Sequence, residues 1–373
     1  MHAPRPIKLA SPCATEAEQR AAAEVLATGR LVLGPRVAAF EARLAEASSR
    51  AHAVAVSSGT AALLAAMHGL GIGSGKTVVV PALAFPAAAQ AAAFLGARVV
   101  ACDVAPDTWN AGPREIAETL ERAGGADLVV AVDLFGVPAE AGEIEALLAG
   151  RGIPLLVDAA CSIGASLCGR PCGAFGAAAI YSFHPRKLVT TGEGGAVVTD
   201  DARLAEHVRR FRNVGADGGV FHGVGLNLRL SEVGAAIGGV QLDALEATIA
   251  RRAALARGYA SLPLRTQAAP AGAARNHQTF AALLPDGAAR ADRDSLVAHL
   301  AGVGIEAQVA SYCLGAIEPL SSILGVGAAE TPVARAVGEL GIALPLHGDL
   351  GIEDVDRVAS AVREWIRNWE GQP

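Results

Sequence analysis

Lys187 is the residue whose neighbours point most directly to chemistry. It closes the stretch Ser182-Phe-His-Pro-Arg-Lys187 and is followed by the glycine-rich run Thr190-Thr-Gly-Glu-Gly-Gly195. An isolated lysine is nearly always a solvated surface charge. Here the glycines allow the backbone to approach a ligand and then return the chain to an apolar strand. The pattern therefore marks Lys187 as a candidate ligand-binding lysine.

Two other motifs carry polar groups at the ends of apolar runs. Ser57-Ser58-Gly59-Thr60 follows a predicted strand and opens a predicted helix, so its N–H groups and hydroxyls could bind an anion. The alternative is an ordinary turn with a serine or threonine cap. Asp158 ends the apolar run Pro154–Val157 and would face a ligand crevice, cap a helix, or pair with a buried arginine.

The elements that would position these residues alternate in type over the first two thirds of the chain. Short β-branched runs are separated by alanine-rich helical segments such as Thr60–Gly69 and Ala139–Ala149. This alternation predicts an α/β fold with a mostly parallel seven-stranded sheet covered by helices. The predicted strands are Ala53–Val56, Thr77–Val80, Arg98–Cys102, Leu128–Asp133, Pro154–Asp158, Ala177–Ser182 and Ala196–Thr199.

The pattern changes after Leu230. Ser231 can cap one long helix that reaches to about Arg257, with Glu232 in its first turn. An Ala/Gly/Pro-rich stretch, in which Ala268–Ala274 has the composition of a loop, precedes further elements. These are Gln278–Leu284, a helix near Arg293–Gly302 and a closing helix near Glu353–Trp369. We predict a large domain over residues 1–250, which includes the N-terminal segment, and a smaller α/β domain over residues 251–373.

Composition excludes several classes of protein. The 373 residues are 52% hydrophobic and 18% charged, with a formal net charge of −6, which excludes a disordered or fibrous chain. Without a basic run we expect no nucleic-acid or membrane partner. The N-terminus lacks the pattern of a signal peptide, and the six cysteines suit reduced thiols, so we expect a cytoplasmic protein. Cys161, Cys168 and Cys172 have no matching histidine pair, and we expect no metal site.

The stretch from Ser182 to Gly195 resembles the cofactor-lysine motif of the DegT/DnrJ/StrS sugar aminotransferases. These are fold-type I enzymes that use pyridoxal 5′-phosphate, and the large domain would bind it. Further motifs follow in the family's order, from about residue 20 to 360, and the spacing of 29 positions from Asp158 to Lys187 is similar to that in relatives. They are Gly34-Pro35, Phe40-Glu41, Ser58–Leu63, Asp103–Asn110, Asp158–Ala160, Gly225–Glu232, Gln241-Leu242 and Leu344–His347.

The resemblance implies roles for individual residues. Lys187 would hold the cofactor as a Schiff base and then act as the proton-transferring base, while Asp158 would pair with the pyridine nitrogen. Phe85 would stack on the cofactor, although a core aromatic is an equally good interpretation. The phosphate would be bound by the N–H groups of Gly59 and Thr60, the Ser182 hydroxyl and Asn227, and Ser58 would belong to the same cofactor site.

In relatives, the residue that matches Asn227 comes from the neighbouring subunit. The resemblance therefore implies a homodimer whose active site lies at the subunit interface. A loop residue that caps a turn is the alternative for Asn227. Arg229 and Tyr312 are candidate substrate-binding residues.

Three positions depart from the family pattern. Cys161 stands where relatives commonly carry Gln or His, close to the cofactor ring. Asp133 begins Asp-Leu-Phe-Gly where relatives often read His-Leu-Tyr-Gly, and Gly315 replaces a common histidine. We expect these three to cluster around the acceptor site, with the cofactor chemistry retained. Cys161 would be a small space-filling residue at the cofactor, and a reactive cysteine is the alternative.

The function implied is transamination in two half-reactions. An amino group would pass from an amino acid, L-glutamate in the first place, to a keto group of a nucleotide-activated sugar. A cyclitol ketone is an alternative acceptor. A second alternative is a sugar dehydratase, although such relatives usually have histidine at the position of Lys187. A non-enzymatic regulatory relative is disfavoured by the retained Asp158–Lys187 pair.

Overall fold

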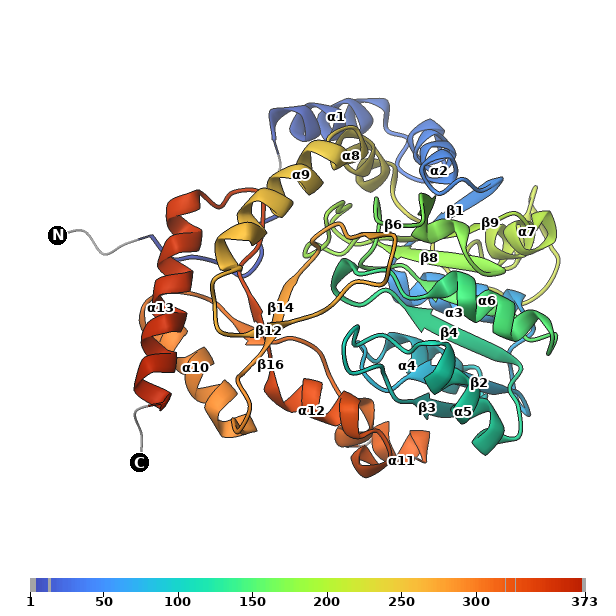
Figure 1. Ribbon diagram of the computed structural model, residues 1–373. Coiled ribbons are helices and arrows are strands. Elements are labelled where there is room, and N and C mark those ends of the chain that lie inside the picture. Colours follow the sequence, from blue (N-terminus) through green and yellow to red (C-terminus); the bar gives the residue numbers. More distant parts are fainter. Residues whose placement is uncertain (1–4, 13–14, 319, 326, 371–373) are drawn as a thin grey trace.

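The computed structural model describes residues 5–12, 15–318, 320–325 and 327–370. Its main sheet has seven strands in the order β1-β9-β8-β5-β4-β2-β3, and only β9 runs against the others (Figure 1). This confirms the predicted fold class. The strands are β1 His52–Val56, β2 Thr77–Pro81, β3 Arg98–Cys102, β4 Leu128–Val132, β5 Leu155–Asp158, β8 Ala178–Ser182 and β9 Gly195–Thr199.

The central strands are buried along their whole length. All five residues of β4 are buried, although successive side chains point to opposite faces of a sheet. Both faces must therefore be covered, which explains why the sequence of β4 is a continuous apolar run rather than an alternating one. The first nine helices are α1 Glu16–Thr28, α2 Pro35–Ala47, α3 Gly59–Gly69, α4 Ala87–Phe94, α5 Pro113–Ala123, α6 Ala141–Ala149, α7 Ala202–Phe211, α8 Glu232–Asp243 and α9 Leu245–Ala256.

A second sheet and a second apolar cluster follow in the chain. This sheet has the order β12-β14-β16-β15, and all its pairs are antiparallel. The cluster beside it contains Ile7 and buried residues from Leu255 to Ile366. The elements are β12 Arg265–Thr266, β14 Phe280–Leu283, β15 Gln308–Val309, β16 Gly341–Leu344, α10 Arg290–Gly302, α11 Leu320–Leu324, α12 Pro332–Leu340 and α13 Ile352–Glu370.

Short strands form within the loops between these elements. A three-stranded sheet joins Ala273–Ala274, at the end of the predicted loop, to a small hairpin near residue 168. A separate hairpin follows α7. These strands are β6 Ser166–Leu167, β7 Arg170–Pro171, β13 Ala273–Ala274, β10 Ala216–Asp217 and β11 Val220–Phe221.

The predicted helix from Ser231 to Arg257 is wrong in one respect: it is two helices. Ser231 caps α8 as expected, because its hydroxyl accepts a hydrogen bond from the Gly234 N–H at 3.0 Å. The chain then bends by 63° at the junction with α9. The two helices have different packing partners, α1 and α2 for α8, and the second apolar cluster for the end of α9. The bend is therefore a consequence of tertiary packing, since no Pro or Gly marks it.

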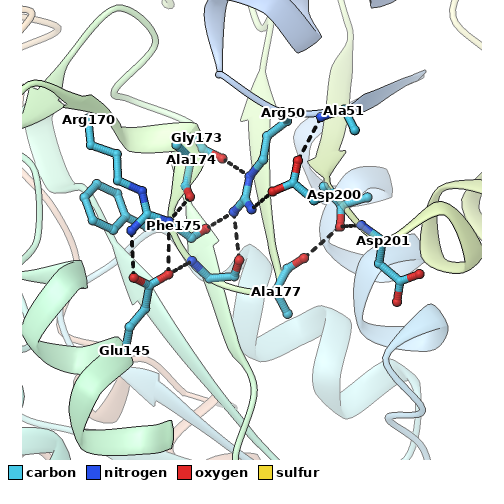
Figure 2. A network of polar contacts seen from close by, with 12 residues as sticks. Arg50, Ala51, Glu145, Arg170, Gly173, Ala174, Phe175, Ala177, Asp200 and Asp201 are labelled. Carbon is cyan, nitrogen blue, oxygen red and sulfur yellow. Dashed lines mark hydrogen bonds and ion pairs between the residues drawn. The ribbon is translucent and has the colours of Figure 1, made fainter.

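Arg50 fastens the start of β1 to the end of β9 and to the turn at Cys172–Ala174 (Figure 2). Its guanidinium donates to the carbonyls of Gly173, Phe175 and Gly176 at 2.6–2.9 Å and pairs with Asp200 at 2.7 Å. The side chain is only 6% exposed. The buried carbonyls of the turn thus have a fixed donor, which holds the edge of the sheet in place.

Within the described residues, no single helix is long and apolar enough to cross a membrane. Helices α8 and α9 pass that test only as a bent pair.

Candidate active site

One pocket of about 490 Å³ collects most of the residues singled out in the sequence. It lies beyond the carboxyl ends of β1, β2, β5 and β8, where α/β sheets bind ligands. Arg252, Gln278, Gln308 and β16 close it from the other side. The predicted site residues that line it are Ser58, Gly59, Thr60, Phe85, Asp158, Cys161, Ser182, Lys187 and Tyr312.

The first turn of α3 forms one end of the pocket. The Ser58 hydroxyl accepts a hydrogen bond from the Ala61 N–H at 3.0 Å, so Ser58 is the helix cap. The N–H groups of Gly59 and Thr60 have no acceptor within the helix and are left for a ligand. A Cβ atom on Gly59 would lie 2.8 Å from the Cβ of Ser182. Glycine is therefore required to bring this turn against the end of β8.

Gly195, one of the glycines after Lys187, makes a close contact with the protein backbone. A Cβ atom on Gly195 would lie 2.4 Å from the carbonyl oxygen of Ser58. The close approach predicted for this glycine is thus to the protein backbone, and it places the Ser58 turn beside β9.

Asp158 is the last residue of β5, and its carboxyl is buried. One oxygen accepts a hydrogen bond from the Ala160 N–H at 3.1 Å. Burial raises the pKa of Asp158, while the Ala160 N–H and the positive charge of Lys187 act in the opposite direction. The charged form would be favoured further by a cation in the pocket.

Lys187 lies in the loop after β8, with its amine 3.0 Å from the sulfur of Cys161. The backbone on both sides of the lysine is held by one side chain that the sequence did not reveal. The Gln278 amide accepts from the Leu188 N–H at 3.1 Å and donates to the Arg186 carbonyl at 2.7 Å. The backbone around the lysine is therefore held by Gln278, which lies just before β14.

Asn276 holds the turn after Asp158 in a similar way. Its amide donates to the carbonyls of Cys161 and Ile163 at 2.9 and 2.8 Å. No motif in the sequence identified Asn276 or Gln278, because each acts on loops more than 85 residues away. Their only signal is the amide-rich triplet Asn-His-Gln at 276–278.

Phe85 and Tyr312 stand at the mouth of the pocket. Phe85 is 67% exposed, so the interpretation as a core aromatic is wrong, whereas stacking on a ligand stays a prediction. Tyr312 is 43% exposed, and its carbonyl accepts from the Ala84 N–H at 3.1 Å. This bond joins the segment before Cys313 to the loop after β2.

Asn227 and Arg229 are not among the residues that line the pocket. Asn227 is exposed and forms an isolated β-bridge with Asn213. The Arg229 guanidinium donates to the Asn213 side chain at 2.8 Å. Within one chain, neither residue reaches the substrate pocket.

The three departures lie only partly at the pocket. Cys161 lines it, and so do Leu134 and Phe135 of the Asp133–Gly136 segment, but Asp133 itself and Gly315 do not. Asp133 points into the protein, where it accepts hydrogen bonds from the Ser162 hydroxyl at 2.6 Å and the Ala139 N–H at 2.8 Å. Gly315 is buried in the turn Leu314–Ala316. Consecutive side chains at a strand end face opposite sides of the sheet. The order of residues in the sequence does not show which side Asp133 faces.

Asp133 should make stability depend on pH. Burial raises its pKa to about 6, above the ordinary value, so the folded state binds a proton that the unfolded state releases. Stability from this group is then present at low pH and lost as the pH rises from about 4 to about 6. We expect the unfolding free energy of Asp133→Asn, relative to wild type, to increase by about 2 kcal/mol over that range.

Urea denaturation at several pH values measures this difference. Asp127→Asn is the control variant. The hydrogen bond from Lys76 lowers the pKa of Asp127, so the contribution of Asp127 to stability changes only at lower pH. A difference for Asp133→Asn that stays constant from pH 4 to pH 7 would contradict a raised pKa.

Among the described residues, no group of three or more His, Cys, Asp or Glu side chains is arranged to hold a metal ion.

Comparison with known proteins identifies the family. Residues 12–363 match the DegT/DnrJ/EryC1/StrS aminotransferase family. A dTDP-3-amino-3,4,6-trideoxy-alpha-D-glucose transaminase of Streptomyces venezuelae is 33% identical and covers 92% of this chain and 91% of its own. GDP-perosamine synthase of Caulobacter vibrioides is 30% identical, with coverages of 88% and 90%.

Solved structures agree with this assignment. The crystal structure of S. venezuelae DesV in complex with a ketimine intermediate is 32% identical to this chain and superimposes with a TM-score of 0.86. The alignment covers 93% of this chain and 94% of that one. The family predicted from the sequence motifs is confirmed. The chain belongs to the DegT/DnrJ/EryC1/StrS aminotransferase family, and its cofactor is pyridoxal phosphate.

Proposed function

We propose that this enzyme moves an amino group from L-glutamate to a keto group of a nucleotide-activated sugar. The observation that carries the proposal is that one pocket holds a lysine amine, a buried carboxylate and the open N-terminus of a helix. The substrate class is supported by relatives named for dTDP- and GDP-linked sugars.

The residues present fit pyridoxal phosphate. The turn at Gly59 leaves N–H groups open, and the cradle between it and Ser182 would be filled by a Cβ atom. The phosphate would bind there, with the Ser182 hydroxyl as a further donor. Asp158 would face the ring nitrogen, Lys187 the aldehyde, and Phe85 a face of the ring.

The bound cofactor supplies an aldehyde that condenses with an amine, and a ring that withdraws electrons from the neighbouring carbon. Lys187 would hold the cofactor and, when released from it, would accept the proton that leaves the α-carbon of the donor. Asp158 would accept a hydrogen bond from a protonated ring nitrogen, a positive partner that would offset the cost of burying the carboxylate. Gln278 and Asn276 hold the loops that carry Lys187 and Cys161.

The alternatives differ in what they require. A dehydratase or a regulatory relative does not need the Asp158–Lys187 pair that faces this pocket. A cyclitol ketone needs the same pair, so only a test with substrates separates it from a keto-sugar nucleotide. The order of preference therefore stays transaminase on a nucleotide sugar, then on a cyclitol.

A half-reaction screen tests the proposal. The purified enzyme should be yellow and lose its visible absorbance on addition of L-glutamate. The aminated form would then be mixed with a panel of keto-sugar nucleotides and cyclitol ketones. Return of the visible absorbance with a sugar nucleotide supports the proposal. Return with cyclitol ketones alone, or no loss of absorbance with any amino acid, contradicts it.

We further propose a homodimer in which Asn227 completes the phosphate site of the other subunit. The hairpin that precedes Asn227 exposes Phe221 at 71% and Val224 at 85%, an apolar surface that suits a protein partner. Asn227 itself is exposed beside Arg229 rather than turned to its own pocket. An active site shared between subunits would explain both the exposed apolar surface and the position of Asn227.

Subunit complementation is the test of this arrangement. Lys187→Ala and Asn227→Asp chains are expected to be inactive separately, the second because the introduced carboxylate would repel the phosphate. Refolded together, they form hybrids in which one site carries both changes and the other carries neither. We expect mixing to restore about a quarter of wild-type activity, half the dimers having one intact site. If Asn227 acts within its own subunit, every hybrid site is damaged and no activity returns.

The domain boundary at residues 250/251 and a cytoplasmic location stay predictions. The second apolar cluster, which begins at Leu255 apart from Ile7, supports the boundary. Free thiols at all five described cysteines suit a reducing compartment; Cys13 lies outside the described residues.

A further inference from the structure

Arg252 is a buried arginine in the active-site pocket that has no carboxylate partner. It lies on α9 and is only 6% exposed. Its Nε donates to the His277 carbonyl at 2.9 Å, and its Nη2 donates to the carbonyls of Gln278 and Leu346 at 2.8 and 2.5 Å. None of the ion pairs among the described residues includes it. Burial lowers its pKa to about 10, so the guanidinium is still charged at neutral pH.

The third nitrogen of this guanidinium, Nη1, is left for a ligand. Nη1 has no hydrogen-bond partner among the described residues. It is also not one of the fully enclosed polar atoms that lack a partner, so it is accessible from outside the protein. Arg252 lines the pocket that also contains Lys187. Nη1 is thus accessible, and because Arg252 lines the pocket, its guanidinium presents there a positive charge without a carboxylate partner in a largely buried setting.

Arg252 is linked to the loop of Lys187 through one residue, Gln278. The carbonyl of Gln278 accepts from Arg252, while the side-chain amide of Gln278 clamps the residues on both sides of Lys187. A single residue thus connects the guanidinium to the lysine loop. An anion held by Nη1 would place the rest of its molecule in the pocket that Lys187 also lines.

The other arginines suit this role less well. Arg229 is bonded to Asn213 and does not line the pocket. Arg186 lines the pocket but is exposed at its rim, where its Nη1 donates to Gln308 at 3.0 Å. Among the described arginines, Arg252 alone combines a buried charge with a free donor on the pocket.

We infer that Arg252 binds a carboxylate of the amino donor. The inference rests on the proposed function, because it takes the donor to be an amino acid such as L-glutamate. The three backbone carbonyls neutralise the positive charge of the guanidinium only in part. A carboxylate would supply the full negative charge that they lack. Charge-assisted recognition at this point would orient the donor's amine toward Lys187.

The test compares the wild-type holoenzyme with Arg252→Lys and Arg251→Lys. Lysine has one nitrogen, which cannot reach three carbonyls and a carboxylate at once. Arg251 is the matched control, since it is next on the same helix and donates to two backbone carbonyls, those of Gly348 and Leu350. One probe is glutarate, which is L-glutamate without the amino group and therefore cannot react. The other is dTDP, a nucleoside diphosphate. Calorimetry measures both affinities.

We expect Arg252→Lys to weaken glutarate roughly 10- to 100-fold and to leave dTDP binding unchanged, with both affinities unchanged in Arg251→Lys. Unchanged glutarate binding in Arg252→Lys, or a loss confined to dTDP, would overturn the inference. So would a loss of glutarate binding in Arg186→Gln that Arg252→Lys does not share. Circular dichroism and the melting temperature report whether each variant is folded.

A second measurement uses the wild type and does not depend on the folding of variants. Phenylglyoxal modifies arginine, and peptide mass mapping locates the adducts. Glutarate should suppress the adduct at Arg252, whereas an adduct at Arg252 that forms equally with saturating glutarate contradicts the inference. Failure of the sugar-nucleotide proposal would appear in the half-reaction screen and would leave these binding results intact.

Discussion

Replacement of Lys187 by alanine should abolish turnover, with a loss of roughly 10⁴-fold or more, because we propose that this amine both holds the cofactor and acts as the base. The chain has three lysines, Lys8, Lys76 and Lys187, and only Lys187 lines the pocket. Borohydride treatment followed by peptide mapping therefore has three possible positions for a fixed cofactor. We expect the label on Lys187 alone.

Lys76→Ala is the control, because Lys76 is a half-exposed lysine paired with Asp127 at 2.9 Å. It should retain the label and the activity. A Lys187→Ala enzyme that still loses its visible absorbance with L-glutamate at the wild-type rate would refute the assignment. The cofactor would then have to be held without a covalent bond, by the α3 turn and Asp158.

The second large effect is expected from Asp158→Asn. The amide preserves the shape and can still accept a hydrogen bond from the Ala160 N–H, but it cannot carry the negative charge that, in the proposed role, would keep the ring nitrogen protonated. We expect turnover to fall by roughly 10²- to 10⁴-fold. Stability without the cofactor should be unchanged or higher, since burial alone raises the pKa of this carboxyl and makes its charge costly.

Melting temperatures of the cofactor-free proteins and turnover rates of the loaded enzymes test the two halves of this prediction. Asp133→Asn is a suitable control, because it also removes a buried carboxyl at the adjacent strand end but one that faces Ser162. It should keep most of its activity. An Asp158→Asn enzyme as active as Asp133→Asn would contradict a role at the ring nitrogen.

Local sequence patterns predicted the elements of the sheet well. Runs such as Arg98–Cys102 are apolar after their first residue because parallel strands are buried on both faces, and strand ends therefore coincide with changes in composition. The junction at Ala244 was missed for a physical reason. Its residues favour a continuous helix, but α8 and α9 bury their faces against different parts of the molecule.

Glu232 shows the same limitation at a helix start. The sequence places it in the first turn of α8, where an acid favours the helix dipole. In the fold its carboxylate also accepts hydrogen bonds from the N–H groups of Gly34, Arg36 and Val37, at the start of α2. A buried acid can cap a second helix almost 200 residues away only when the fold brings the two together.

For the site, the sequence alone determined the residues that sit at strand ends and act through local motifs. Lys187, Asp158 and the Ser58–Thr60 turn are recognisable because each motif requires its own neighbours to adopt the right backbone conformation. The tertiary structure decided everything that depends on distant segments. It turned Asp133 away from the pocket, placed Asn227 and Arg229 outside it, and brought in Gln278 and Arg252. Hydrogen bonds between segments this far apart leave no periodic or spacing signal, since they arise from packing between sheets rather than from local backbone preference.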